Sequence, residues 1–293
     1  MANGIIIIDK PQGWTSMDVC AKLRGMFQER RVGHAGTLDP MATGILPVFL
    51  GRATRAVEFT EGYDKEYVAS LRLGVVTNTQ DTTGEILEER PVRVGRQELE
   101  AVLEQFRGDI LQVPPMYSAI KVNGKKLYEL ARKGREVERK PRPVTISSLE
   151  LLGQEENGDW KLRVECSKGT YIRTLCHDIG QDLGCGGTMS ALRRTRVGPF
   201  VEGVSLEQVQ QEADQGRAQA MLTGVEGCFA HLPIAEAAAR ERDKFILNGA
   251  AYPCRLAPGR YRVRGPEGEF LMVGEVKDGK MTTVKSFFEV DRS

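Results

Sequence analysis

A short stretch near the N-terminus brings together residue types that can carry chemistry. Residues 33–40 read GHAGTLDP, which places a histidine, His34, and a carboxylate, Asp39, in one glycine-containing loop. Glycine lets the backbone approach a ligand closely, so a carboxylate held here is a candidate catalytic group. The same letters also fit a structural role, with Asp39 as N-cap and Pro40 as the first residue of a helix that continues into the apolar residues behind it.

Two further stretches carry candidate site residues. Tyr67 lies in KEYVASLRL (65–73), where alternation with Ala69 and Leu71 predicts one face of a strand. Arg173 lies in CSKGTYIRTL, at the start of a predicted helix, and faces away from the apolar residues of that helix. From the pattern alone, Tyr67 fits a core residue and Arg173 fits a surface residue. A functional interpretation therefore needs the rest of the chain.

Composition limits the class of protein. The chain has 293 residues, 41% of them hydrophobic, and a formal net charge of +1, which suits one large domain or two unequal ones and indicates no polyanionic partner by itself. No segment approaches membrane-spanning length and the N-terminus lacks a signal-peptide pattern, so we expect a cytoplasmic protein. The cysteines and histidines show no metal-ligand spacing, which predicts reduced core thiols and no metal site.

Basic residues are nevertheless clustered locally. Residues 121–142 hold nine Lys or Arg against three Glu, and a second cluster contains Arg193, Arg194 and Arg196. Either cluster can be a solvated surface. Because aromatic residues are interleaved with both clusters in a chain that is otherwise neutral, we favour contacts with nucleic-acid phosphates.

Apolar periodicity alternates between strand and helix along the chain. It predicts strands at 4–10, 65–73 and 159–169 and helices at 15–27, 96–106, 170–184 and 205–213. Ser205 and Gln208 form a capping-box pattern at the start of the last helix. After about residue 228, short β-like runs separated by glycine-containing turns predict a small β-rich module. We therefore expect two domains, 1–228 and 229–293.

Seven stretches, taken in order along the chain, resemble those of a known enzyme family. They are IDKPQGWTS, GHAGTLDPMATGILPVFLG, DKEYVASLRLG, TNTQDTTGEI, PPMYSAIKVNGKKLYELAR, CSKGTYIRTL and ALRRTRVGPF, and they span nearly all of residues 4–200. The chain resembles the bacterial TruB family of tRNA pseudouridine synthases, which isomerise uridine 55 in the TΨC arm. The resemblance implies an α+β pseudouridine synthase fold, with a mixed, largely antiparallel sheet and flanking helices. More loosely, the C-terminal module resembles the PUA-type RNA-binding domain of that family.

The resemblance also implies roles for individual residues. Asp39 matches the essential catalytic carboxylate, Tyr67 the tyrosine that faces the target base, and Arg173 the arginine paired to the aspartate. The other matching positions contact the substrate in the family, and they are His34, Tyr171 and Leu192.

The chemistry explains why these residue types are needed. Pseudouridine formation breaks the C1′–N1 glycosidic bond, turns the uracil and joins C1′ to C5 without redox change, so we expect no cofactor. Asp39 must be ionised to attack the sugar or the base or to take a proton from the ribose, and the sequence leaves these alternatives open; Arg173 favours the ionised form. The target base must leave its stack, and we expect residues 121–142, including Lys125 and Lys126, to bind phosphates. The expected partner is tRNA, with no membrane and no metal, and the protein is expected to be a monomer.

Other classes of protein fit less well. DTTG at 81–84 matches a GTPase switch, but the chain has no phosphate-binding loop of the GxxxxGK[ST] type. The serious alternative is a non-catalytic protein that binds or folds RNA, and the intact Asp39, Tyr67 and Arg173 favour an enzyme instead. A relative that acts on ribosomal or small nuclear RNA is disfavoured by the short C-terminal module and the absence of a long basic tail.

Overall fold

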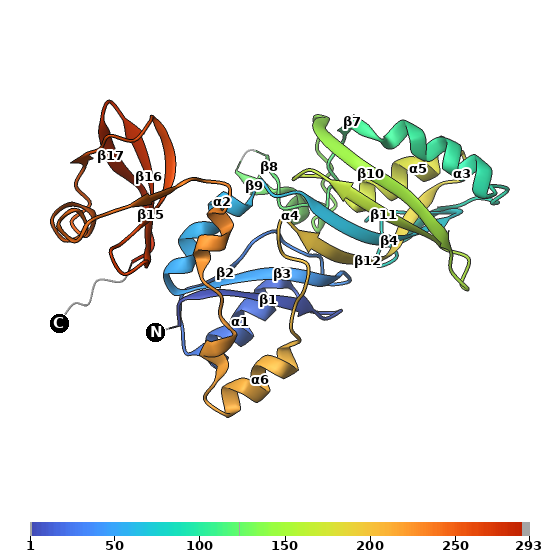
Figure 1. Cartoon of the computed structure of the whole chain (residues 1–293). Coiled ribbons are helices and arrows are strands. Elements are labelled where there is room, and N and C mark those ends of the chain that lie inside the picture. The colour runs from blue at the N-terminus through green and yellow to red at the C-terminus, as the bar shows by residue number, and fades with distance from the viewer. Residues whose placement is uncertain (1, 123, 289–293) are drawn as a thin grey trace.

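Most of the chain is organised around one eight-stranded sheet (Figure 1). The computed structural model describes residues 2–122 and 124–288. The strand order is β1-β3-β12-β4-β11-β10-β7, and β2 pairs with β3. The strands are β1 (Gly4–Lys10), β2 (Val32–His34), β3 (Thr43–Leu50), β4 (Lys65–Leu73), β7 (Gly108–Gln112), β10 (Arg142–Gln154), β11 (Trp160–Cys166) and β12 (Gly187–Val197). All pairings are antiparallel except the short one between β3 and β12, so the expected mixed, largely antiparallel sheet is confirmed.

Helices pack on the sheet in two groups. They are α1 (Ser16–Phe27), α2 (Val57–Thr60), α3 (Arg96–Leu103), α4 (Leu127–Ala131), α5 (Ile172–Asp182) and α6 (Leu206–Asp214). Helices α1 and α6 share a hydrophobic cluster with β1 and β3, whereas α3 and α5 share another with β4, β11 and β12. None of the described helices is long and apolar enough to cross a membrane. The two clusters meet where β3, β12 and β4 lie side by side, and this junction positions the candidate site.

Local sequence signals account for most of these elements. Strands β1, β4 and β11 and helices α1, α3, α5 and α6 occur where the periodicity predicts them, within a few residues. Thr15 caps α1 by accepting a hydrogen bond from the backbone N–H of Asp18. Ser205 and Gln208 form the predicted capping box of α6. Two small hairpins complete this part, made of β5 (Val75–Thr77) with β6 (Ile86–Glu89) and of β8 (Lys121–Val122) with β9 (Lys125–Lys126).

One structural alternative is wrong: Asp39 and Pro40 do not start a helix. The backbone N–H of Ala42 donates to the carbonyl of Asp39 (3.0 Å), which closes a turn, and the apolar run that follows is strand β3. A run that contains Gly44 and Pro47 is a poor helix, because glycine is flexible and proline removes a backbone donor. The run is buried along nearly its whole length, so it lacks the alternation that marks a half-exposed strand.

The C-terminal residues form a separate five-stranded sheet, at the left of Figure 1. Its strands are β13 (Ile234–Glu236), β14 (Tyr252–Pro253), β15 (Gly259–Arg264), β16 (Phe270–Lys277) and β17 (Lys280–Ser286), and the short helix α7 (Ala239–Glu241) follows β13. The sheet has a hydrophobic cluster of its own. The expected small β-rich module is therefore present, and the boundary near residue 228 stays a prediction.

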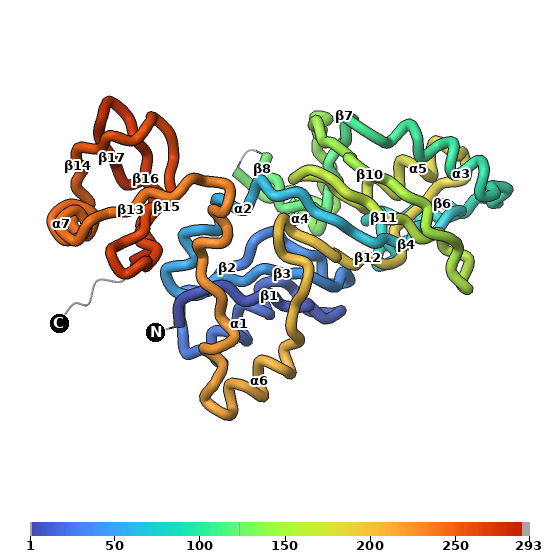
Figure 2. The backbone as a smooth tube through the Cα atoms, in the orientation of Figure 1, coloured from blue at the N-terminus to red at the C-terminus, as the bar shows by residue number. Residues whose placement is uncertain are grey.

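An aromatic cluster joins this module to the main sheet. Figure 2 shows the connecting chain running from α6 past α2 toward β13. On this connection Phe229 is 1% exposed, and its ring centroid lies 5.1 Å from that of Phe59, 5.7 Å from Phe270 and 5.4 Å from Phe287. Phe59 belongs to the main part, whereas Phe270 and Phe287 belong to the module. Apolar burial of this kind holds the two parts together.

Candidate active site

The loop that carries Asp39 is fixed from both sides. The hydroxyl of Ser16, at the start of α1, accepts from the N–H of Leu38 (2.9 Å) and donates to its carbonyl (3.2 Å). On the other side, the carbonyl of Pro40 accepts from the N–H of Gly13 (2.8 Å) and from the buried ammonium of Lys10 (3.4 Å). Hydrogen bonds on each side of Asp39 leave its backbone little freedom. The part that Lys10 plays in this support was not predicted from the sequence.

Asp39 is paired with Arg173, as predicted. The Nε of Arg173 lies 3.0 Å from Oδ2 of Asp39. Arg173 is in the first turn of α5 and is only 6% exposed, so it is not the surface arginine that the helical pattern also permitted. Its guanidinium also donates to the carbonyls of Thr79 (3.2 Å) and Tyr117 (2.8 Å). The side chain that orients Asp39 is therefore itself held from several directions.

A second carboxylate lies on the other side of Arg173. Oδ2 of Asp81 is 3.6 Å from Nη1 of Arg173, and Asp81 is 4% exposed. Its other oxygen accepts from the hydroxyl of Thr79 (2.8 Å) and the N–H of Thr83 (3.0 Å). We call Asp39, Arg173 and Asp81 the catalytic cluster, because Asp39 is the predicted catalytic carboxylate. Sequence reasoning missed Asp81, although it begins the DTTG stretch that matches a switch motif, because the pattern did not show that Arg173 is buried beside it.

Burial sets the ionisation of Asp39. Burial raises the pKa of this carboxyl above its ordinary value, Arg173 opposes that rise and Asp81 adds to it. Its side chain is still 41% exposed, so it stands at the open edge of the catalytic cluster. A carboxylate that is oriented by a guanidinium and accessible to a ligand can act as a nucleophile or a base.

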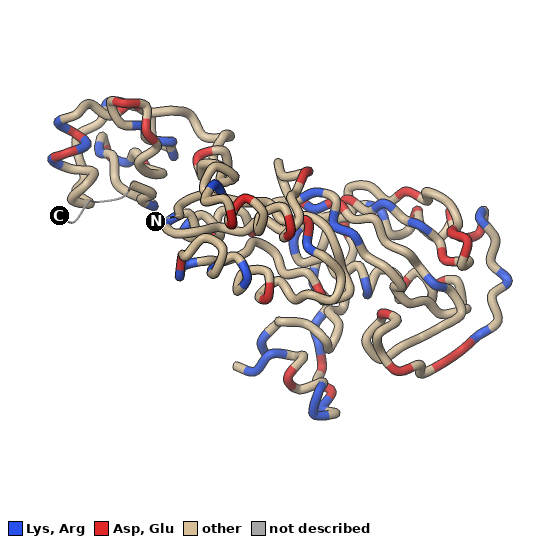
Figure 3. The backbone as a smooth tube through the Cα atoms, turned by 90° about the horizontal axis from the view of Figure 1, so that it is seen from below, with Lys and Arg blue, Asp and Glu red and all other residues tan. Residues whose placement is uncertain are grey.

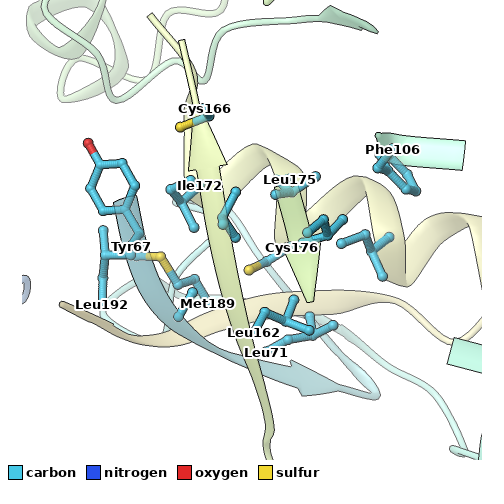
Figure 4. Packing of buried hydrophobic residues seen from close by; sticks show 14 of the residues in the cluster. Tyr67, Leu71, Phe106, Leu162, Cys166, Ile172, Leu175, Cys176, Met189 and Leu192 are labelled. Atoms are coloured by element: carbon cyan, nitrogen blue, oxygen red, sulfur yellow. The ribbon is translucent and has the colours of Figure 1, made fainter. Parts of the chain in front are cut away.

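Tyr67 and Leu192 form an apolar wall next to the cluster. Both are 9% exposed and belong to the core cluster beneath the sheet, as the core interpretation of Tyr67 required. Figure 4 shows the Tyr67 ring and Leu192 together at one end of this core, with the Tyr67 hydroxyl directed away from it. Burial raises the pKa of Tyr67, so its hydroxyl stays protonated at neutral pH. The two roles considered for Tyr67, core packing and a surface for a flat ring, are compatible.

His34 and Tyr171 are partly buried residues that belong to elements of the same site. His34 ends β2, its buried Nδ1 has no hydrogen-bond partner among the described residues, and burial lowers its pKa, which favours the neutral ring. Tyr171 is the N-cap residue of α5, and its backbone is held by Gln112, which accepts from its N–H (2.7 Å) and donates to its carbonyl (3.0 Å). Burial raises the pKa of the Tyr171 phenol as well.

Residues 121–142, which we call the basic segment, are mostly exposed at the positions that the structure describes. Lys125 is exposed, and the ammonium of Lys126 lies 5.3 Å from the ring centroid of Tyr128. Among residues 2–122 and 124–288, no hydrogen bond or ion pair joins either lysine to the catalytic cluster. Figure 3 shows basic and acidic residues interspersed along the backbone, in keeping with a net charge of +1. The assignment of Lys125 and Lys126 to phosphate binding stays a prediction.

The second basic cluster is not a uniform phosphate-binding surface. Arg194 is 1% exposed, so its interpretation as a phosphate contact is wrong. Arg193 pairs with Asp9 (2.7 Å) and Arg196 with Glu165 (3.3 Å). Strand alternation explains the error, because β12 turns Leu192 and Arg194 to one face and Arg193 to the other.

Family models and curated relatives identify the family. Residues 24–172 match the model of the TruB family pseudouridylate synthase N-terminal domain, and residues 173–230 match that of the tRNA pseudouridylate synthase B C-terminal domain. The chain belongs to the TruB family. The tRNA pseudouridine synthase B of Stutzerimonas stutzeri (strain A1501) is 46% identical over 288 residues, which cover 95% of this chain and 93% of that protein. The enzyme of the same name from Francisella tularensis subsp. novicida (strain U112) is 42% identical over 293 residues, covering 99% and 96%.

Solved structures extend the likeness of this TruB-family chain to the C-terminal module. A structure of an H/ACA RNP bound to a substrate RNA containing 2′-deoxyuridine has a chain with a TM-score of 0.73 and 26% identity, covering 99% of this chain and 86% of that one. The structure of a Cbf5-Nop10-Gar1 complex has a chain with a TM-score of 0.72 and 28% identity, covering 98% of this chain and 85% of that one. Membership of the TruB family makes the chain a pseudouridine synthase, an isomerase, and confirms the expected fold class.

Proposed function

We propose that this protein isomerises uridine 55 in the TΨC arm of tRNA to pseudouridine. The observation that carries the proposal is the ion pair of Asp39 with Arg173, in a chain whose relatives over nearly its full length are named tRNA pseudouridine synthase B. The substrate named in those relatives is tRNA, and the resemblance of the seven sequence stretches supplies the position within it. The protein acts in the cytoplasm as a monomer.

The catalytic cluster fits an isomerisation that keeps every atom of the substrate. The C1′–N1 bond breaks, the uracil turns without leaving, C1′ bonds to C5, and the proton of C5 is transferred to the released nitrogen. Asp39 supplies the negative charge that attacks the sugar or the base or takes a ribose proton. Arg173 fixes the direction of that carboxylate, and Asp81 fixes Arg173. The reaction has no redox step, and the chain's own residues carry it without a cofactor.

Binding requires the target nucleotide to leave its stack. We propose that the uracil lies against Tyr67 and Leu192, with Tyr171 beside it, and that the neutral ring of His34 packs against the extruded nucleotide. Glycines on each side of His34 allow that close approach. The basic segment, including Lys125 and Lys126, binds phosphates of the arm. The C-terminal module is a PUA-like RNA-binding domain that adds contacts elsewhere on the tRNA.

Mapping pseudouridine in total RNA tests this proposal. RNA from cells that lack the modification is incubated with the pure protein, and new pseudouridines are located by a chemical probe specific for that base. The expected result is one new site, position 55 of tRNAs. New sites in ribosomal or other RNA alone would contradict the substrate, and RNA binding without any new pseudouridine would favour the non-catalytic alternative.

A further inference from the structure

A buried arginine that the proposed chemistry leaves unused lies beside the site. Arg194, on β12, is among the largest fully buried side chains. Its neighbour Arg193 has a carboxylate partner, but none of the ion pairs formed by the described parts of the chain includes Arg194. A cation taken out of water without a counterion is unfavourable unless its donors are satisfied by well-placed acceptors. The acceptors of Arg194 therefore indicate what it does.

Arg194 connects three elements that form the site. Its Nε donates to the carbonyl of Ile45 on β3 (2.8 Å), and its Nη2 donates to the carbonyl of Gly36 (3.0 Å), in the loop that leads to Asp39. On β4, Tyr67 is its direct partner in the strand register, and the positive charge of Arg194 opposes the rise that burial causes in the Tyr67 pKa. A planar guanidinium has donors in fixed directions, so it can hold all three groups in one arrangement.

Two glycines make room for Arg194: Gly36 in the Asp39 loop for its side chain, and Gly44 in β3 for its backbone. At Gly36, with φ +73°, an added Cβ would lie 3.2 Å from Nη1 of Arg194. At Gly44, with φ +102°, it would lie 2.1 Å from the Arg194 carbonyl oxygen, closer than atoms can approach. Both positions also need a backbone conformation that side chains disfavour. Gly36 thus leaves room for the Arg194 guanidinium, and Gly44 lets the backbones of β3 and β12 approach each other.

We propose that Arg194 is a positioning residue, which fixes the Tyr67 ring relative to the Asp39 loop so that the uracil and the carboxylate meet in one geometry. The proposal rests on the proposed function, since it assumes that a uracil lies against Tyr67. Arg194 is too deeply buried to touch the substrate and acts through Tyr67 and Gly36. Small displacements of reacting groups lower the rate of the chemical step far more than they weaken binding. Replacing Arg194 should therefore lower kcat, while RNA affinity depends on other, exposed residues.

Kinetics of Arg194→Lys and Arg194→Met on an unmodified TΨC stem-loop test this role. We expect kcat to fall about 100-fold for Met and about 10-fold for Lys, with KM within about threefold of wild type. Arg72→Met is the matched control, because Arg72 is on the same strand as Tyr67 and binds Asp159 through two N–H groups, each at 2.9 Å, about 17 Å along β4 from Tyr67. This control should melt at a lower temperature and keep wild-type kcat.

A double-variant cycle with Tyr67→Phe separates positioning from general stability. If Arg194 acts partly through the phenol, Arg194→Lys lowers kcat by a smaller factor in the Tyr67→Phe background than in wild type. Thermal melting shows whether each variant is folded, and Arg194→Lys serves where Arg194→Met does not fold. Wild-type kcat in folded Arg194→Lys, or a kcat loss matched by Arg72→Met, would overturn the role of Arg194. A wild-type protein without turnover would overturn the proposed function and this role with it.

Discussion

The catalytic cluster and the basic segment both depend on charge, but they are built in opposite ways. In the cluster, Arg173 is 6% exposed and contacts two carboxylates and two backbone carbonyls. In the basic segment, Lys125 is exposed and Lys126 contacts the hydroxyl of Tyr128 at 3.3 Å. Fixed charges suit a step whose rate depends on direction, whereas solvated charges suit attraction to a phosphate backbone. Changes in the cluster should therefore affect turnover, and changes in the segment should affect affinity and its salt dependence.

Arg173→Lys should have the largest effect among the changes that keep charge. Lysine retains the positive charge but cannot contact Asp39 and Asp81 in the fixed directions of a guanidinium. We expect turnover under single-turnover conditions to fall about 100-fold and RNA affinity to change less than about threefold. Arg163→Lys, at an exposed pair with Glu150, is the control and should keep full turnover. Normal turnover of the Arg173→Lys variant would contradict the proposed role of Arg173 in orienting Asp39.

Asp81→Asn should have an intermediate effect and a characteristic pH profile. Turnover should fall about tenfold, since Arg173 loses one of its two charged partners. Asp81 raises the pKa of Asp39, so its removal lowers that pKa and leaves Asp39 ionised to lower pH. The acid limb of the kcat profile should therefore move to lower pH than in wild type. A limb that moves to higher pH would contradict the assignment of Asp39 as the titrating group.

Removal of the C-terminal module should affect binding more than turnover. A chain that ends at Leu232 keeps the contact between Phe229 and Phe59, whereas one that ends at Gly227 loses it. We expect the longer chain to fold, to keep kcat on a stem-loop within about threefold and to raise KM for full-length tRNA about tenfold. Melting temperatures check the folding, and kcat and KM measured on the stem-loop and on full-length tRNA check the kinetic expectations. Loss of stem-loop turnover in a folded chain would mean that the module completes the site.

Replacement of Lys125 and Lys126 by Ala should have the smallest effect on turnover. The slope of log affinity against log salt should flatten by about one unit for each phosphate that the variant no longer neutralises, with kcat unchanged. Affinity measured over a range of salt concentrations checks the slope. Replacing the exposed Lys22 and Lys161 by Ala provides a control of equal charge change outside the basic segment and outside the module. An unchanged slope for the Lys125 and Lys126 variant would make this part of the basic segment a solvated surface that binds no phosphate.

The sequence predicted the positions of apolar strands and helices better than the burial and the partners of charged side chains. Periodicity placed β4 and α5, and with them the positions of Tyr67 and Arg173, because strand and helix patterns show which side chains share a face. It did not show that Arg173 is buried. It did not reveal that Arg194 is buried, because a cluster of arginines suggests a surface until the strand partners are known. Asp81 was missed for a related reason, since its role comes from its ion pair with Arg173, which lies far away in the sequence. Contacts between segments far apart in sequence leave little local trace.

The most direct test compares turnover and affinity of Asp39→Asn on one RNA. Asparagine is nearly isosteric and removes the negative charge, and Arg173 keeps Asp81 as partner, so the fold should persist. We predict no detectable pseudouridine in a stem-loop that wild type converts fully, with affinity within about tenfold, or 1.4 kcal/mol, of wild type. Measurable turnover by a clean Asp39→Asn preparation would contradict the role of Asp39 as the catalytic carboxylate.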